Sequence, residues 1–188
     1  MRVRGAIRPV AVAATLAATA VAAGSSGAAG STAAAGSGAA AGPVLSSPAF
    51  AAGARIPAIY TCTGQGKRPA LAWKGLPGGT RSLAIEVVDP DAPVPGGFTH
   101  WLAWNIAPGK GGAGALGGSA KVPREGAPGF GAPGWVGPCP PSGVHRYVFT
   151  LFALRAPLAL PAGADRPAFE QAVGGSLAKA TLVGRYGR

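Results

Sequence analysis

The chain has 188 residues, of which 32 are glycine and 19 are proline, and its 17 lysines and arginines outnumber six acidic residues to give a net charge of +11. This length predicts one domain with tails. The basic residues of 44–188 are scattered singly and are not interleaved with aromatic side chains, which argues against nucleic-acid binding. A positively charged surface still allows peripheral contact with an anionic surface outside the cell.

The N-terminal segment, residues 1–23, has the pattern of a cleavable signal peptide. Three arginines among the first eight residues precede an apolar run from Val10 to Ala23, which ends in small residues suited to cleavage. The run is shorter than a transmembrane helix, which needs about 20 apolar residues. We therefore expect a secreted or extracytoplasmic protein. Residues 24–43 are nearly all Gly, Ala and Ser and predict a low-complexity linker, which leaves 44–188 as one domain.

The domain is predicted to consist mostly of β-strands. Residues 82–89 alternate with the period of a strand that has one wetter face. Residues 145–154 are apolar on both faces from Val148 onward and predict a central strand. In chain order the expected strands are 54–61, 69–73, 82–89, 99–107, 145–154 and 180–186, and proline at the ends of the first two favours sheet edges.

One helix is expected near the C-terminus. Asp165 can cap it, and Phe169, Val173 and Leu177 then recur every four residues. Residues 108–137, in contrast, are rich in Gly and Pro and carry little strand or helix signal. A stretch of this length is typical of a functional or disordered loop.

Titratable side chains gather at the ends of the predicted strands. Both histidines of the domain, His100 and His145, and two of its six acids, Asp89 and Asp91, lie in two short segments. Prolines stiffen the turn that carries the two carboxylates. Because His145 and Tyr147 are two residues apart in a strand, they share one face. Together these residues predict a small polar pocket.

Paired motifs surround the same residues: "DPDAP" at 89–93 is followed by "HW" at 100–101, and "GPCPP" at 137–141 is followed by "HRY" at 145–147. In this combination they resemble the phosphatidylethanolamine-binding protein family, in the bacterial branch named for its similarity to the Raf kinase inhibitor protein. The resemblance extends from "LSSPAF" at 45–50 to "LVGRY" at 182–186. It implies a mostly β fold, in which a large antiparallel sheet packs on a smaller one with peripheral helices, and a small anion pocket at one end.

The resemblance also implies the residues of that pocket. Carried over to this chain, they are Asp89, Asp91, His100, His145 and Tyr147, with Trp101, Pro138, Cys139 and Pro140 as walls and a cis peptide bond between Ala92 and Pro93. The expected ligand is a small anion or a phosphorylated or zwitterionic head group, because imidazoles can donate to oxygens and carboxylates can accept from an ammonium group. We expect no catalysis, no cofactor and no metal.

Two other functions stay open at this point. One is a protein-interaction module that inhibits a protease or kinase-like partner, and the other is a metal-assisted hydrolase that uses the histidines and aspartates as ligands. The chain departs from the family pattern on the expected rim, so the departures affect the identity of the ligand more than the fold. They are Thr63, the inserted Lys67-Arg68, Pro128 and Trp135.

The two cysteines, Cys62 and Cys139, lie in the first and second halves of the domain. An even number of cysteines in an exported protein favours a disulfide. A bridge that closes so long a loop stabilises the fold by about 4 kcal/mol in the chain-entropy account. A pair of buried thiols is the alternative.

Overall fold

A computed structural model describes residues 42–188. The predicted signal peptide, and all but the last two residues of the predicted linker, lie outside the described residues. Within 42–188 no helix is both long and apolar enough to cross a bilayer.

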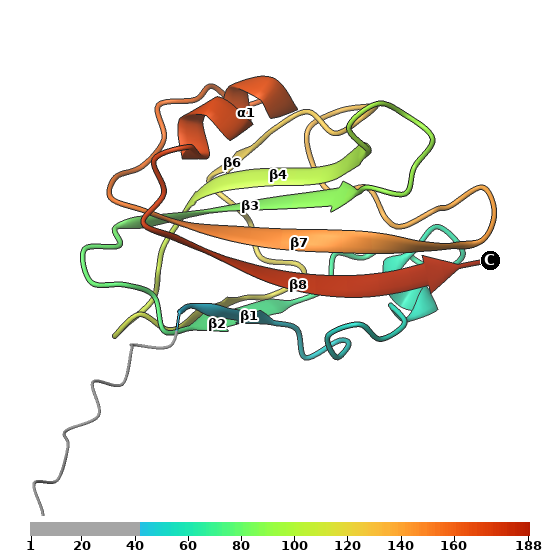
Figure 1. The fold of residues 1–188 in the computed structure, drawn as a ribbon, viewed down its shortest axis with the longest axis horizontal. Coiled ribbons are helices and arrows are strands. Elements are labelled where there is room, and N and C mark those ends of the chain that lie inside the picture. The colour runs from blue at the N-terminus through green and yellow to red at the C-terminus, as the bar shows by residue number, and fades with distance from the viewer. Residues whose placement is uncertain (1–41) are drawn as a thin grey trace, which may run out of the picture. The chain divides into compact units, whose positions relative to one another are not determined.

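The described residues form two antiparallel sheets and one α-helix (Figure 1). The smaller sheet has the strand order β1-β2-β5, and the larger has the order β6-β4-β3-β7-β8. In chain order the elements are β1 (Val44–Ser46), the 3-10 helix η1 (Ala58–Tyr60), β2 (Leu71–Lys74), β3 (Ser82–Asp89), β4 (Phe98–Ile106), β5 (Gly114–Leu116), β6 (Arg124–Glu125), β7 (Val144–Leu154), α1 (Arg166–Val173) and β8 (Ala178–Gly187). The predicted fold class is confirmed.

Hydrophobic cores lie on both faces of the large sheet. The larger core joins it to the small sheet and includes Trp73 of β2 and Phe149 of β7. The smaller core lies beneath α1, where Phe169 packs against Trp104 of β4. Trp101 belongs to the larger core and Trp104 to the smaller, so the two tryptophans lie on opposite faces of β4.

Strand β3 is buried along its whole length, so the prediction of one wetter face was wrong. The reason is that α1 covers that face. Arg166, the first residue of α1, donates from Nε to Oε1 of Glu86 at 2.8 Å. Burial raises the pKa of the Glu86 carboxyl group, and the guanidinium of Arg166 acts in the opposite direction. The helix therefore both covers β3 and pairs the buried carboxylate of Glu86.

Two other strand predictions need correction. Residues 54–61 do not form a strand, because they cover the edge of β8 through single hydrogen bonds such as Arg185 N to Ala54 O and then enter η1. The strand expected at 69–73 is β2, which lies between β1 and β5 and is not at an edge. Pro69 stands before the strand, where it removes no hydrogen bond from the ladder. The stretch 108–137 contains two short strands, β5 and β6.

Helix α1 begins as predicted, because the Asp165 side chain accepts a hydrogen bond from the backbone of Ala168. It ends at Val173, before two glycines. Leu177 therefore lies beyond the helix, and its backbone N–H bonds Ala153 of β7. Strand β7 lies between β3 and β8, inside the large sheet as expected.

Strand β4 contains two β-bulges, at each of which one of its residues has no partner on β3. Val87 and Val88 pair with Trp101 and Thr99, so His100 is left without a partner across the ladder. Near the other end Asn105 is skipped in the same way, and its φ is 61°. Such bulges re-aim the side chains they carry. One of the two histidines therefore owes its direction to a bulge.

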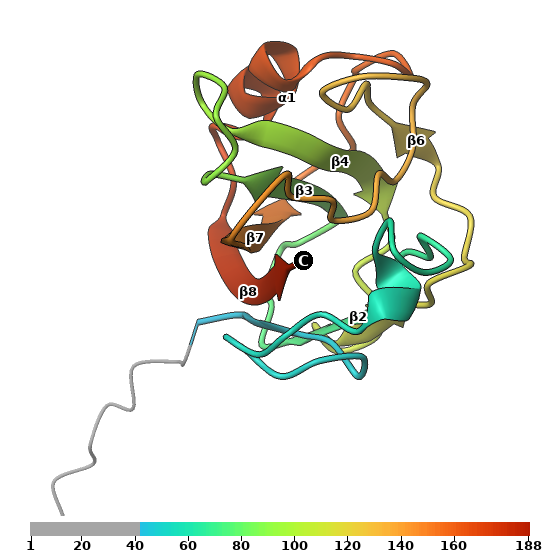
Figure 2. The same ribbon diagram turned by 90° about the vertical axis from the view of Figure 1, so that its right-hand side faces the viewer.

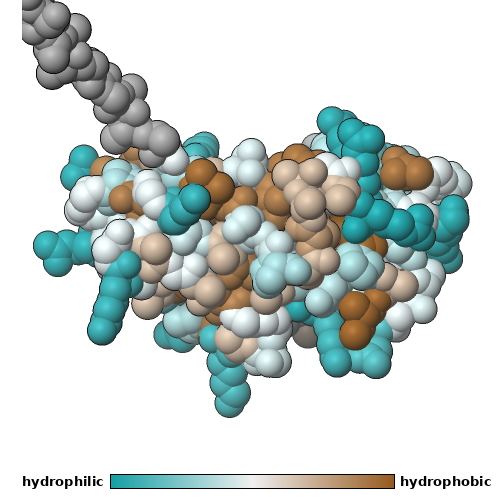
Figure 3. All heavy atoms as spheres, turned by 90° about the horizontal axis from the view of Figure 1, so that it is seen from below, coloured by the Kyte–Doolittle hydropathy of each residue, from teal (hydrophilic) through white to brown (hydrophobic). Residues whose placement is uncertain are grey.

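The face beneath the small sheet is mixed in character. Figure 3 shows apolar residues interspersed with hydrophilic ones, and hydrophilic side chains gather at the right-hand end. In Figure 1 the same end carries η1 and the C-terminus of the chain.

Candidate functional site

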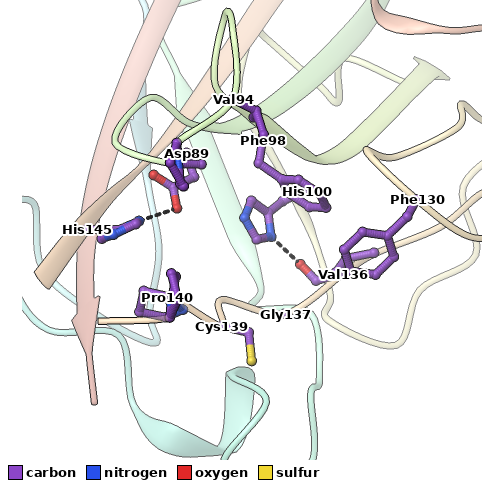
Figure 4. A pocket seen from close by; sticks show the side chains of 13 residues that line it. Asp89, Val94, Phe98, His100, Phe130, Val136, Gly137, Cys139, Pro140 and His145 are labelled. Atoms are coloured by element: carbon purple, nitrogen blue, oxygen red, sulfur yellow. Dashed lines mark hydrogen bonds and ion pairs between the residues drawn. The ribbon is translucent and has the colours of Figure 1, made fainter. Parts of the chain in front are cut away.

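A cavity of about 170 Å³ opens at the end of the large sheet where β3 ends and β4 and β7 begin. Figure 2 looks onto this end of the molecule, and Figure 4 shows the cavity from close by. Its lining residues are Asp89, Ala92, Pro93, Val94, Phe98, His100, Phe130, Val136, Gly137, Cys139, Pro140, Pro141 and His145.

A buried hydrogen bond between Asp89 and His145 forms part of the cavity wall. Asp89 is 3% exposed, and its Oδ2 lies 2.7 Å from Nδ1 of His145. Its other oxygen accepts the backbone N–H of Asp91 at 2.9 Å. Because a carboxylate accepts, Nδ1 of His145 must carry the hydrogen, which leaves Nε2 of the ring available to a ligand. The two residues are 56 positions apart in the chain and meet because β3 and β7 are neighbours.

His100 faces this pair from the bulge in β4. Its Nδ1 donates to the carbonyl oxygen of Val136 at 2.8 Å, so Nε2 is again the free nitrogen. In Figure 4 that nitrogen points towards Asp89 and His145. Burial lowers the pKa of the His100 ring, and its hydrogen bond to Val136 and the charge of Asp89 oppose the shift. The neutral ring therefore offers a lone pair at Nε2.

Tyr147 lies behind His100 and does not line the cavity, contrary to expectation. Its ring is fully buried and meets the His100 ring edge to face at 5.0 Å between centroids. The hydroxyl has no hydrogen-bond partner among residues 42–188. Burial and the charge of Asp89 raise the pKa of this phenol. The bulge in β4 turns His100 towards Tyr147, so the Tyr147 ring packs against the His100 ring from behind.

Asp91 is also outside the cavity, because Arg146 holds it on the outer surface. Its carboxylate accepts two hydrogen bonds from the guanidinium, at 2.6 and 2.9 Å, and one from the backbone N–H of Arg146. The side-chain bonds to Arg146 lower the pKa of Asp91 to about 2. This pair ties the turn after β3 to the start of β7.

Two of the expected wall residues are buried elsewhere. Trp101 is fully buried and donates its indole N–H to Glu125 at 2.6 Å. Pro138 is buried, and its carbonyl accepts from the backbone of Cys62. Cys139 and Pro140 do line the cavity, as predicted.

Sequence reasoning missed the apolar rim. The ring of Phe98 lies 4.8 Å from that of His100 and 4.9 Å from that of Phe130, and Phe130 is 67% exposed. Gly129 makes this arrangement possible, since a Cβ at that position would lie 2.3 Å from the Phe98 ring. The one signal was an aromatic residue inside a Gly- and Pro-rich loop that also carries the "GPCPP" motif.

A disulfide joins Cys62 to Cys139, with Cα atoms 5.3 Å apart, as predicted. Cys139 also lines the cavity, so the bridge anchors the loop that forms one wall. The guanidinium of Arg188 lies against the sulfur of Cys139 at 3.0 Å.

The Ala92–Pro93 bond is trans, as are all peptide bonds in residues 42–188, so the expectation of a cis bond was wrong. Trans is the lower-energy form before proline by about 0.5–1 kcal/mol. The turn closes through hydrogen bonds from Val94 N to Ala92 O and from Gly97 N to Val94 O.

The cavity combines hydrogen-bond acceptors with sites that can take up a proton. Asp89 is an acceptor, and each histidine presents Nε2 as an acceptor when neutral and as a donor when protonated. No three His, Cys, Asp or Glu side chains are grouped as metal ligands within the described part of the chain. The geometry is therefore that of a small polar floor with an apolar rim.

Comparison with known proteins places this geometry in a family. The family described as phosphatidylethanolamine-binding protein matches residues 46–187. A protein of Methanothermobacter thermautotrophicus, named UPF0098 protein, is 42% identical over 149 residues, which cover 77% of this chain and 98% of that protein. LppC of Mycobacterium tuberculosis, named as a lipoprotein, is 40% identical over 148 residues, which cover 76% and 71% of the two chains.

Solved structures agree with these sequence matches. CT736 of Chlamydia trachomatis, a phosphatidylethanolamine-binding protein homologue, superposes with a TM-score of 0.73 at 33% identity, over 78% of this chain and 98% of that one. YbcL of E. coli, described as a member of the mammalian family, gives a TM-score of 0.71 at 26% identity, over 79% and 99%. The matched range, 46–187, contains all the residues of the cavity. The chain belongs to the phosphatidylethanolamine-binding protein family.

Proposed function

We propose that this protein is an exported, non-catalytic binding protein whose cavity holds a small oxyanion, in particular a phosphorylated head group. The observation that carries the proposal is the convergence of His100, His145 and buried Asp89 in a cavity with an apolar rim. A few converging polar groups within apolar walls are typical of a small-molecule site. The volume of about 170 Å³ holds a group much larger than one water molecule.

The buried carboxylate of Asp89 selects among oxyanions. A fully ionised phosphate beside it is repelled, because like charges a few ångströms apart raise the free energy in a region of low dielectric constant. A ligand that brings a proton or an ammonium group avoids this cost, since either one gives the carboxylate or an imidazole Nε2 a donor. Phosphoethanolamine meets both conditions.

Three observations support export. The N-terminal residues have the signal-peptide pattern. The domain also holds a disulfide, and disulfides persist mainly in oxidising compartments outside the cytosol. One similar protein, LppC, is named as a lipoprotein.

A second candidate function is recognition of a protein partner through the rim. Phe130 is 67% exposed and Val94 is 46% exposed, and both line the mouth of the cavity. Exposed apolar side chains around a polar pocket suit a docking surface for a side chain of a partner. Stoichiometric inhibition of a protease or kinase-like enzyme, unaffected by phosphoethanolamine, would favour this function over the first.

Calorimetric titration with phosphoethanolamine tests the proposed function. Replacing His100 by Ala removes one hydrogen bond to a charged group, a loss of about 1.5–3 kcal/mol, or roughly ten- to hundredfold in affinity. The matched control is Asp91→Asn, from the same motif but outside the cavity, which should leave the affinity unchanged. Equal affinity in wild type and His100→Ala, or no binding at all, would refute the proposal.

A turnover assay tests the non-catalytic part separately. Purified protein incubated with p-nitrophenyl phosphate should release no p-nitrophenol above the uncatalysed rate. Release that disappears in His145→Gln would instead assign the Asp89–His145 pair a role in general base catalysis, since a carboxylate-oriented imidazole is also the arrangement of such sites.

A further inference from the structure

A second recess, of about 400 Å³, lies apart from the cavity described above and shares no lining residue with it. It is lined by Tyr60, Lys67, Arg68, Ala70, Gly118 and Ser119. The Lys67-Arg68 pair in this group is one of the positions at which the sequence departs from the family pattern. The proposed function makes no use of this recess.

Arg68 is a buried cation whose donors are only partly used. Its side chain is 9% exposed, and its guanidinium lies over the Trp101 ring at 4.5 Å. Nη2 donates to the carbonyl oxygens of Gly117 and Ala120, at 3.1 and 2.5 Å. Nε is buried and has no hydrogen-bond partner among residues 42–188.

The nearest carboxylate compensates this charge poorly. Nη1 of Arg68 lies 3.8 Å from Oε1 of Glu125, which is beyond hydrogen-bonding distance. The same oxygen already accepts the indole N–H of Trp101 at 2.6 Å. Both N–H groups of Nη2 are used by the two carbonyls, so the two N–H groups of Nη1 are the donors that remain besides the buried Nε. Leaving donors of a buried cation unpaired costs free energy that an oxyanion would recover.

Other donors surround the recess. Lys67 is exposed and adds a second positive charge at its mouth, and Ser119 contributes a hydroxyl group. The phenol of Tyr60 can donate as well. Burial lowers the pKa of Arg68, as expected for a cation whose charge is incompletely compensated, and Glu125 opposes that shift.

We propose that this recess is a second oxyanion-binding site, in which Nη1 of Arg68 donates to a phosphate or carboxylate group and Lys67 and Ser119 complete the coordination. The site differs from the first cavity in chemistry. It presents permanent cations, whereas the first cavity presents a carboxylate and two titratable imidazoles. It therefore attracts ionised oxyanions directly, and the pH dependence of phosphate binding there is expected to follow the second ionisation of the phosphate, at a pKa of about 6 for phosphate monoesters.

An amide NMR titration of the purified protein with inorganic phosphate tests the proposal. The amides of Lys67, Gly118 and Ser119 should shift together, with a dissociation constant distinct from that of the shifts around His100 and His145. In the double variant Lys67→Met/Ser119→Ala the recess should bind at least tenfold more weakly, while the shifts around the first cavity persist. Lys74→Met removes the same charge from an exposed position on β2 and should change neither set.

Further variants and ligands separate the possible outcomes. Arg68→Lys keeps the charge but loses the planar guanidinium and its Nη1 donors, and should weaken recess binding even though the chain folds, as checked by near-ultraviolet circular dichroism. Acetate in place of phosphate shows whether a carboxylate is accepted, and chloride at equal ionic strength reports screening alone. A recess response that is equal with chloride, or unchanged in the double variant, would overturn the proposal. If only the recess responds to phosphate, the second site stands and the proposed function of the first cavity fails.

Discussion

Each of the two cavity histidines has one ring nitrogen committed to the protein. His100 donates Nδ1–H to Val136 and His145 donates Nδ1–H to Asp89, at 2.8 and 2.7 Å. A neutral ring in this tautomer presents the lone pair of Nε2 to the cavity, next to the carboxylate of Asp89. Because an oxyanion also offers only lone pairs, at least one proton must enter the site with it.

Phosphoethanolamine binding is consequently expected to strengthen as pH falls from 8 to 6. Burial holds the pKa of free His100 below its usual value of 6.5, and a bound oxyanion raises it, so binding takes up a proton. Calorimetry in two buffers with different ionisation enthalpies measures that uptake directly. Equal affinity at both pH values without proton uptake would show that the histidines bind as neutral groups.

The same lowered pKa has a consequence for the free protein. The unfolded chain binds a proton at His100 more readily than the folded chain, so the stabilising contribution of the neutral ring is present above pH 6.5 and is lost as pH falls through the folded pKa. Ligand binding reverses the trend, since the charged ring is then paired.

Asp91 offers a second titration at the residue scale. Its hydrogen bonds to Arg146 lower the pKa of its carboxyl group to about 2 from a usual 3.8, so the pairing stabilises the fold above pH 3.8 and is lost as pH falls through 2. Carbon-detected NMR should place the Asp91 midpoint near 2 in wild type and closer to 3.8 in Arg146→Gln. A wild-type midpoint near 3.8 would mean that the two side chains are not paired in solution.

The two bulges of β4 decide what that strand contributes. One leaves His100 unpaired and turns it towards Tyr147, and the other leaves Asn105 unpaired. The amide of Asn105 then bonds both backbone groups of Leu158. A regular β4 would present alternate residues to alternate faces throughout. The bulges instead give the strand one residue for the cavity and one that fastens a loop over the smaller core.

The disulfide should account for a measurable share of the stability. It links residues 77 positions apart, and its removal in Cys62→Ser/Cys139→Ser is expected to cost about 4 kcal/mol of unfolding free energy. Urea denaturation measures the difference, with reduced wild type as a control that changes no side chain. We also expect weaker phosphoethanolamine binding, because Cys139 forms part of the cavity wall. An unchanged midpoint would show that the bridge adds no stability.

The large sheet brings distant parts of the chain together at one end. The end of β3, the beginnings of β4 and β7 and the loop before β7 all meet there (Figures 1 and 2). Both faces of the sheet are covered, and the cavity forms beyond its strand ends, where backbone packing stops and side chains of the connecting turns close the space.

Export is a prediction about the whole molecule. If cleavage follows the small residues near Ala22, mass spectrometry of material from the culture medium or cell envelope should show a chain that lacks its first 22 or 23 residues. Replacing two of the first three arginines by Glu should reduce export without changing the folded domain. Full-length chain recovered only from the cytoplasm would contradict the prediction.

Local patterns in the sequence were sufficient for much of this structure. Strand 82–89 follows from alternation, the start of α1 from the capping residue Asp165, and the fold class from motifs shared across a family. The first two features depend on residues close together in the chain, so a single sequence contains their cause. The sequence left two alternatives for the cysteines, a disulfide or a pair of buried thiols. The paired motifs, through their resemblance to the family, predicted that both histidines and Asp89 lie together at one end of the domain.

What the sequence did not reveal depends on contacts between distant segments. Asp91 leaves the cavity because Arg146, 55 residues away, binds its carboxylate, and Tyr147 is covered because a bulge moves His100 over it. The burial of both faces of β3 depends on where α1 packs, and the apolar rim depends on Gly129 lying against Phe98. Residue types and spacing thus determined which groups reach the site, and tertiary packing alone decided which of them face the cavity, because a side chain's direction depends on the free energy of its contacts as well as on its place in a strand.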